Sequence, residues 1–264
     1  MKIHSKKINV SFRSLALFIC LLILGNLAIA QEANSDTKPI KSKPAKNTFA
    51  GNLIIDNQTV MVPAKGVLEF VIQHRFGVIN KGYEDFYGLF APSNMRLGFN
   101  YTPVANLQVG FGLTKERKKW DGNVKYAIGR QSQLNDGWPF SLTYYGAIAI
   151  DTRKKEGNFI YGTDRISYFH QLLLARKFTP NFSVQIAPSL SWFNNVEGYM
   201  SSDSTVKAKM KNAQFSIAFS GSLAVTKKMA IIANYDQPIT QHPTNNPHPN
   251  ISLGIQLSTA THTF

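Results

Sequence analysis

A two-residue alternation of large apolar side chains with polar or small ones returns about ten times between Val67 and Leu257. Residues 107–113 show its simplest form, because every odd position is large and apolar and every even position is Gln or Gly. This period is that of a β-strand with one apolar face. Each segment is about as long as a tilted strand that crosses a bilayer. The alternation predicts an all-β chain, either a transmembrane barrel or a soluble sandwich.

The N-terminus indicates export. Four basic residues precede an unbroken apolar run over residues 15–24. Ala-Ile-Ala at 28–30 then offers the small residues that a signal peptidase accepts. We therefore predict a signal peptide over residues 1–30. The run is short for a retained spanning helix, and no second apolar run of ~20 residues follows it. The single cysteine, Cys20, lies in this run, so the mature chain offers no thiolate for disulfides, catalysis or metal binding.

Composition divides the rest of the chain. Residues 31–48 are polar, with two prolines and four lysines, and predict a flexible periplasmic leader. Residues 49–63 mix apolar and polar side chains and could enter the fold as an extended segment, with no role that the sequence reveals. We assign residues 49–264 to one β-barrel domain. Phe264 is out of phase with the last apolar segment, so either a bulge intervenes or, as we expect, the domain lacks its last strands.

The side chains opposite the apolar face, and the connections, favour the membrane barrel. The opposite face consists of Gly, Ala, Ser, Gln or a charge, as in a crowded, wet lumen, and Gly110 and Gly112 would make room there. Long links follow alternate segments, at residues 77–93, 115–123, 151–165, 194–213 and 236–250, and mostly tight turns follow the others. Such alternation is typical of outer-membrane barrels. We predict an antiparallel, up-and-down transmembrane β-barrel of about 10 to 12 strands.

Basic residues gather in the long links. Removing the four cations of the predicted signal from the formal net charge of +14 leaves about +10. An exported barrel would meet anionic glycolipid and not nucleic acid. The residues expected to face glycolipid phosphates are Lys115, Arg117, Lys118, Lys119, Arg153, Lys154, Lys155, Lys207, Lys209 and Lys211. The alternative is that they are only solvated loop tips.

Polar side chains of opposite charge share the predicted lumen face. They are Glu69, Gln73, Arg75, Arg96 and Lys125. Such a network could plug the bore or line a polar path. Because a barrel of about ten strands is narrow and largely filled by side chains, a structural network is favoured over a pore.

The chain shows no catalytic motif. None of the histidines after the predicted signal lies in a His-x-Ser or Gly-x-Ser-x-Gly pattern, and phosphate-binding glycine loops are absent. His242 and His248 lie in a loop with three prolines, where a metal would need a third ligand such as Asp236. A proline-stiffened turn is favoured there. We expect no enzymatic activity, no cofactor and no metal, with outer-membrane lipid, anionic glycolipid and a small solute as the partners to consider.

Residues 65–77 (Lys-Gly-Val-Leu-Glu-Phe-Val-Ile-Gln-His-Arg-Phe-Gly) resemble an uncharacterised bacterial outer-membrane β-barrel family that is classed as a domain of unknown function (DUF5777). The resemblance continues through residues 94–101, 109–115, 121–126 and 249–255, and covers residues 49–264. It implies an outer-membrane barrel and carries over no catalytic or binding residue. Members of that family continue past the position of Phe264 through further strand-like sequence.

Three functional hypotheses follow. The leading one is an integral outer-membrane barrel that passes or binds a small solute or has an envelope-structural role. The alternative is a soluble exported β-sandwich or barrel that binds a ligand or partner. The third is an outer-membrane lipid-modifying enzyme, which would need a His or Asp cluster at one rim and directs attention to His74 and His170.

Overall fold

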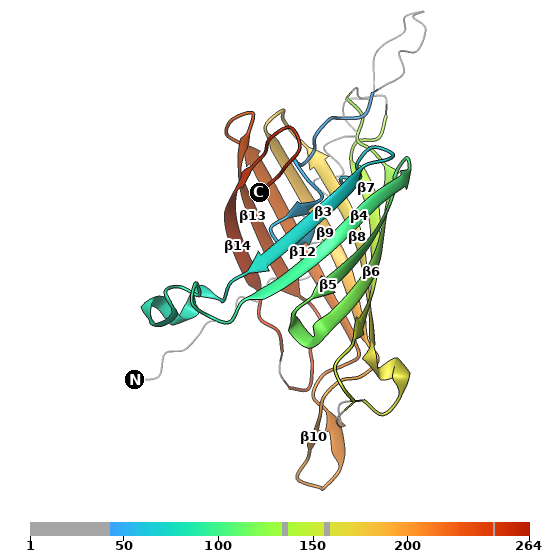
Figure 1. Ribbon diagram of the computed structural model, residues 1–264, viewed down its shortest axis with the longest axis vertical. Coiled ribbons are helices and arrows are strands. Elements are labelled where there is room, and N and C mark those ends of the chain that lie inside the picture. Colours follow the sequence, from blue (N-terminus) through green and yellow to red (C-terminus); the bar gives the residue numbers. More distant parts are fainter. Residues whose placement is uncertain (1–42, 134–136, 156–158, 245) are drawn as a thin grey trace, which may run out of the picture. The chain divides into compact units, whose positions relative to one another are not determined.

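The computed structural model describes residues 43–133, 137–155, 159–244 and 246–264 (Figure 1). The predicted signal peptide and residues 31–42 of the predicted leader lie outside these ranges. The chain divides into two compact units, residues 1–41 and 42–264, and everything below concerns the second unit. Within the described residues, no helix is both long enough and apolar enough to span a membrane.

Ten long antiparallel strands form one sheet, as the alternation predicts. They are β3 (Leu68–Arg75), β4 (Asn94–Val104), β5 (Leu107–Thr114), β6 (Lys119–Gly129), β7 (Ser141–Asp151), β8 (Ile166–Lys177), β9 (Phe182–Phe193), β12 (Ala213–Ala224), β13 (Met229–Pro238) and β14 (Asn250–Leu257). Each strand pairs with the next of these ten along the chain, so the topology is up-and-down. β3 and β14 are the edges, and within the described residues no ladder joins them.

Short elements complete the fold. Two small hairpins are formed by β1 (Leu53–Ile54) with β2 (Asn57–Gln58), and by β10 (Gly198–Met200) with β11 (Val206–Ala208). Three 3-10 turns are η1 (Ile79–Asp85), η2 (Glu116–Lys118) and η3 (Gly162–Arg165).

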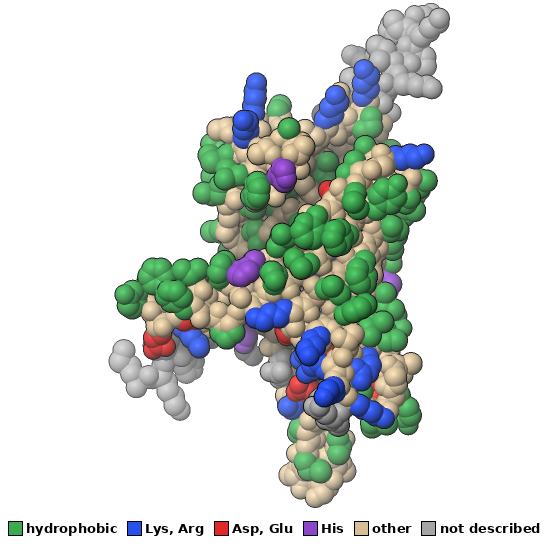
Figure 2. All heavy atoms as spheres, in the orientation of Figure 1, with side chains coloured by type: hydrophobic (Ala, Val, Ile, Leu, Met, Phe, Trp, Pro, Cys, Tyr) green, Lys and Arg blue, Asp and Glu red, His purple; other side chains and the backbone are tan. Residues whose placement is uncertain are grey.

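The two faces of the sheet differ as the alternation requires. In β5, Val109, Phe111 and Leu113 are exposed on the outward face, whereas Gln108 is buried on the inward face. Figure 2 shows hydrophobic side chains spread over the outward surface of the strands. Outward aromatic residues lie near both ends of this apolar band, with Trp120 at one end and Trp138 at the other. This arrangement is that of a lipid-facing surface between two aromatic girdles.

Most of the long links lie at one end of the sheet and the short turns at the other, where the link over residues 130–140 is the exception (Figure 1). The prediction of a long link over residues 115–123 is wrong, because β6 begins at Lys119 and only residues 115–118 join it to β5. Lys119 is therefore a strand residue. The charged and small residues at 121–123 resemble a turn in sequence, but Asp121 points inward, where Arg96 pairs with it.

The lumen contains a dry cluster as well as polar groups. Leu173 of β8 and Ile232 of β13 are buried inward, and they belong to one cluster with Phe49, Ile54 and Val60. This cluster explains why the sequence of β8 has apolar residues in both phases. The lumen is thus drier than the wet interior that the small inward residues predict, because a segment preceding the first long strand fills part of it.

The last residues turn back along β14. Leu257 and Phe264 exchange two backbone hydrogen bonds of 2.8 Å each, and Ser258 pairs with Thr263. Phe264 therefore lies beside the end of β14 and not within it. This turn is the physical reason why Phe264 is out of phase with the outward residues of that strand.

A charge on the outward face should destabilise the protein in the membrane. Phe111→Arg places a cation on the exposed face in the middle of β5, where the bilayer-midplane penalty is about 2–4 kcal/mol. We expect a lower free energy of unfolding in lipid vesicles, measured by urea titration of heat-modifiable gel mobility. The same residue in the exposed tip of the β10–β11 hairpin, Ser202→Arg, is the control. Equal stability of the two variants would show that Phe111 does not face lipid.

Candidate functional site

An inner segment, residues 49–63, lies against the inward face of the ten-stranded sheet. Its backbone is held by polar side chains of the wall. Gln185 of β9 accepts a hydrogen bond from Val60 N at 3.0 Å and donates one to Gln58 O at 2.7 Å. Thr143 of β7 donates to Val60 O at 3.0 Å, and Asn234 of β13 donates to Ile54 O at 2.6 Å. The segment is therefore tied to strands on several sides of the lumen.

Lys125 of β6 is the most deeply buried charged side chain among the described residues. Its Nζ donates to the carbonyls of Asn52 at 3.2 Å and Met61 at 3.5 Å, and lies 6.0 Å from the ring centroid of Tyr145. A buried ammonium is costly unless carbonyls or carboxylates satisfy it. The hydrogen bonds of Lys125 thus hold the inner segment against β6, and they require the segment to be in place.

Glu69 of β3 is the acidic partner on the opposite side of Asn52. Its carboxylate accepts hydrogen bonds from the Asn52 side chain and from Gln108 Nε2, the latter at 2.9 Å. Asn52 therefore bridges Glu69 and Lys125 through its side-chain amide and its backbone carbonyl. The bridge joins two of the predicted lumen residues through a residue of the inner segment.

A second cluster centres on Arg96 of β4. Its guanidinium binds Asp121 of β6 in a bidentate manner, with distances of 2.5 and 2.9 Å, and donates to Gln73 at 3.4 Å. Both partners of the ion pair are largely shielded from solvent. Gly112 makes room for this pair, because a Cβ at that position would overlap the Arg96 guanidinium. Gly112 thus provides space in the lumen, as the sequence predicts.

Arg75 lies apart from these clusters. Its Nε donates to Asp56 at 2.5 Å in a half-exposed ion pair that joins the end of β3 to the turn between β1 and β2. The structure thus brings the five predicted lumen residues into three separate contacts with the inner segment or the wall. They do not form one continuous network.

Several residues of the site are not predicted from the sequence. They are Asn52, Gln108, Asp121, Thr143, Tyr145, Gln185 and Asn234. Those on the wall lie in the inward phase of their strands, so the alternation could have identified them. Their partners in residues 49–63 carry no periodic signal that would place them in the lumen.

The leader boundary has defined contacts in the described residues. Ala45 N donates to Gln131 O at 2.6 Å, and Lys177 Nζ donates to the carbonyls of Lys46 and Asn47 at 3.3 and 2.9 Å. These contacts lie at the end with short turns. The chain therefore enters the lumen from that end.

The predicted basic residues gather at the opposite end, where Figure 2 shows a concentration of Lys and Arg side chains. Arg153, Lys207 and Lys209 form ion pairs with Asp151, Asp203 and Glu197. Lys115 Nζ donates to Ser93 O at 3.0 Å. The pairs of Lys207 and Lys209 are exposed and contribute little stability. The basic side chains at this end of the sheet leave the rim predominantly cationic.

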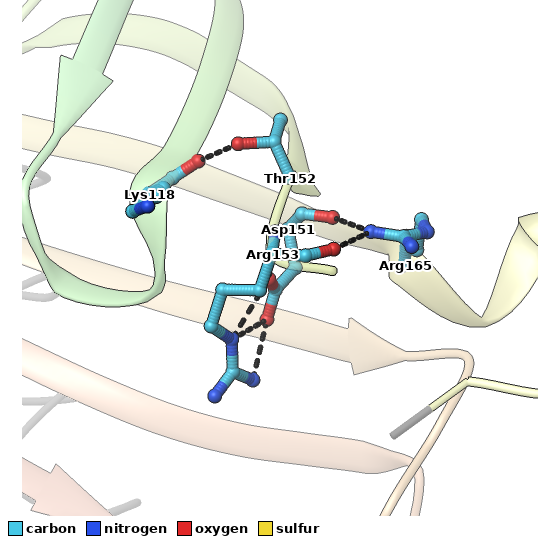
Figure 3. A network of polar contacts seen from close by, with 5 residues as sticks. All are labelled: Lys118, Asp151, Thr152, Arg153 and Arg165. Carbon is cyan, nitrogen blue, oxygen red and sulfur yellow. Dashed lines mark hydrogen bonds and ion pairs between the residues drawn. The ribbon is translucent and has the colours of Figure 1, made fainter. Parts of the chain in front are cut away.

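One polar network fastens two links at this rim (Figure 3). Arg165 Nη1 donates to the carbonyls of Asp151 and Arg153 at 2.8 and 2.5 Å, and Thr152 Oγ1 donates to Lys118 O at 2.5 Å. The hydrogen bond from Arg153 to the Asp151 carboxylate raises the pKa of the Arg153 guanidinium. The ion pair places Arg153 beside the end of β7.

The proline-rich loop between β13 and β14 is shaped by local hydrogen bonds. His242 is buried, its Nδ1 accepts from Lys211 N at 3.0 Å, and its backbone N–H donates to Asn246 at 2.7 Å. Asp236 and His248 line a cavity of about 200 Å³ with His242. In the described part of the chain, no group of three or more His, Cys, Asp or Glu side chains could hold a metal ion. The prolines and Asn246 account for the shape of the loop.

The comparison with protein families gives one match. A family model described as a membrane-bound β-barrel domain (DUF5777) matches residues 49–264. Neither the curated proteins nor the solved structures contain a significant match.

The room that Gly112 provides can be tested by filling it. Gly112→Val should displace the Arg96 guanidinium from Asp121 and lower the free energy of unfolding by about 1–3 kcal/mol, because a shielded charged hydrogen bond is lost. Urea titration in vesicles measures the effect. Gly221→Val is the matched control, since a Cβ there meets nothing within 4 Å. An equally small effect at both positions would contradict the role of Gly112.

Proposed function

Because the chain belongs to the family of membrane-bound β-barrel domains, we propose that it is an integral outer-membrane barrel closed by its own inner segment, with an envelope-structural role. The observation that carries the proposal is the position of residues 49–63 on the inward face of the ten-stranded sheet. Their backbone is bonded to the wall through Lys125, Thr143, Gln185 and Asn234. A solute could cross the lumen only after these bonds were broken.

The proposed location in the outer membrane combines two observations. The sequence of residues 1–30 has the features of an export signal, and the exported chain carries strands with one apolar face. Membrane location follows from the family. Closed barrels that reach a membrane by export are typical of the outer membrane of bacteria.

The proposed role is non-enzymatic. His74 lies on the exposed outward face of β3, and His170 lies on the outward face of β8, where its Nδ1 is 2.7 Å from Tyr144 Oη. Neither imidazole belongs to a cluster with a carboxylate and a nucleophile within the described residues. His74 is the next-to-last residue of β3 and His170 lies in the middle of β8, two strands that are not neighbours in the sheet, so the two imidazoles do not form the rim cluster that a lipid-modifying enzyme would need.

Solute passage is the second candidate function, and one observation favours it. The inner segment contributes only the two-residue strands β1 and β2, and it is bonded to the wall mainly by side chains and not by a long ladder. It could therefore leave the lumen without breaking the ten-stranded sheet. In this candidate function the inner segment is a gate.

The closed state can be tested by conductance in planar bilayers. The intact protein should be silent, because the inner segment fills the lumen. Removal of residues 49–63 should produce steady channels, because the wall side chains that hold the segment would then face water. Removal of residues 197–211, which carry the β10–β11 hairpin outside the strands, is the matched control and should leave the barrel silent.

A substitution series keeps this test informative if the deletion fails to fold. Lys125→Met combined with Asn234→Ala removes two donors to the inner segment and should give brief openings. Steady conductance of the intact protein would overturn the closed barrel and favour solute passage. Silence of every folded variant would show that the inner segment does not block the lumen.

We propose anionic glycolipid as the partner of the basic rim. Lys154→Gln with Lys155→Gln, an adjacent exposed pair in the link after β7, should weaken binding of a purified anionic glycolipid by about 1 kcal/mol per lost charge at low salt. Titration of the detergent-solubilised protein measures this change, and added salt should reduce it. The adjacent pair at the short-turn end, Lys227→Gln with Lys228→Gln, is the matched control. An equal loss from both pairs would indicate attraction without a preferred rim.

A further inference from the structure

The link between β3 and β4 carries an exposed apolar surface that the closed barrel does not explain. We call residues 76–90 the aromatic paddle. Ile79, Tyr83 and Phe90 expose 75%, 79% and 78% of their surfaces, and Phe76 and Tyr87 are also more than half exposed. The 3-10 turn η1 within the paddle buries no residue. The paddle therefore has large apolar side chains without a core of its own.

The backbone of the paddle nevertheless has a fixed shape. Gly77 N donates to Gly88 O at 2.9 Å across its neck, and Asp85 Oδ1 accepts from Gly88 N at 2.8 Å. Gly88 has a φ of +84°, and a Cβ at this position would overlap the backbone of Gly77. Only glycine permits this close approach, so the neck of the paddle depends on Gly88. The exposed side chains of the paddle are thus presented by an ordered backbone.

Aromatic rings of the paddle pack around Phe86, those of Tyr83 and Tyr87 in T-shaped contacts and that of Phe90 in a tilted one. The ring centroid of Phe86 lies 5.9 Å from that of Tyr83, 6.4 Å from that of Tyr87 and 5.7 Å from that of Phe90. The rings therefore form one continuous patch. A patch of this kind on a protein surface marks a site of contact with a partner or a membrane.

The position of the paddle relates it to the lipid-facing band. Figure 1 shows it standing out sideways from the ends of β3 and β4, at the end with long links. In Figure 2, hydrophobic side chains cover its upper edge, which is the edge nearer the level of the strands, and acidic and basic side chains lie along its lower edge. The outward residues Phe70 and Ile72 of β3 are followed on the same face by His74, whose ring centroid lies 4.4 Å from that of Phe76. The apolar edge of the paddle thus continues the apolar band of the strands, and the charged side chains lie beyond it.

We propose that the aromatic paddle lies in the membrane–water interface at the long-link end of the barrel, with its apolar edge among the upper acyl chains. Aromatic side chains prefer this depth, and amphipathic segments lie there with their charged edge in water. The continuity with β3 places the paddle at that depth once the strands span the bilayer. The paddle is an interfacial anchor beside the β3 edge of the sheet, a role that needs membrane location but not a closed lumen.

Lipid-depth quenching tests this placement. Cys20→Ser removes the only native thiol, and Ile79→Cys and Phe90→Cys each provide one site for a bimane fluorophore in the full chain. After reconstitution into phosphatidylcholine vesicles, lipids brominated near the top of the acyl chains should quench both labels, because the apolar edge should lie about 5–10 Å inside the headgroup boundary. Aqueous iodide should quench them weakly.

Glu84→Cys, on the same turn but with a charged side chain, is the matched control. Its label should respond to iodide and not to brominated lipid. If the labels at positions 79 and 90 behave like that at position 84, the paddle is in water and the proposal is overturned. If they resist both quenchers, a second copy or another protein covers the paddle, and the proposal is overturned as well.

A conservative variant covers the case in which labelling prevents folding. Phe90→Trp keeps an aromatic ring at the site, and its emission should shift to shorter wavelength on transfer from dilute micelles of a short-chain detergent to vesicles. Its added fluorescence should be lost with brominated lipid, relative to Glu84→Trp. Equal quenching of the two added tryptophans would overturn the proposal.

Discussion

The backbone of the inner segment crosses the lumen with only a two-residue hairpin of its own, so its remaining N–H and C=O groups need partners from the wall. Gln185 supplies both an acceptor and a donor, and Asn234 and Lys125 supply donors. These polar side chains can be buried on the inward face because they form hydrogen bonds with the backbone of the segment. Without it, Lys125, Gln185 and Asn234 would lose these partners, so the arrangement of the wall and that of the segment depend on each other.

The outward surface obeys the opposite requirement. In lipid, every strand must pair its backbone with a neighbour, and the side chains between must be apolar. The ladder from β3 to β14 meets this requirement for the strands between its two edges, and the exposed row of Val109, Phe111 and Leu113 supplies apolar side chains. At the long-link end the requirement changes from apolar to amphipathic. The aromatic paddle and the cationic links lie at this level, one suited to the acyl boundary and the other to anionic headgroups.

Prediction from the sequence succeeds where a residue's environment depends on strand period alone. The ten strands, their outward residues and the space made by Gly112 are of this kind. Prediction fails where the environment of a residue depends on a partner that is far away in the sequence. Asp121 resembles a turn residue until Arg96 is known to lie beside it, and the two-phase pattern of β8 is ambiguous until Leu173 meets the inner segment. Residues 49–63 have no period, so nothing local predicts that they enter the lumen.

The sequence by itself determined the strands, their faces, their neighbours and the end at which the long links lie, because pleat and connection length are properties of consecutive residues. The tertiary structure alone decided what the lumen contains, which charges pair, and where the paddle stands. These features join residues far apart in the chain, as Asn234 and Ile54 show. Whether such residues meet depends on how the sheet curves and how its strands are staggered, and a linear pattern does not specify either.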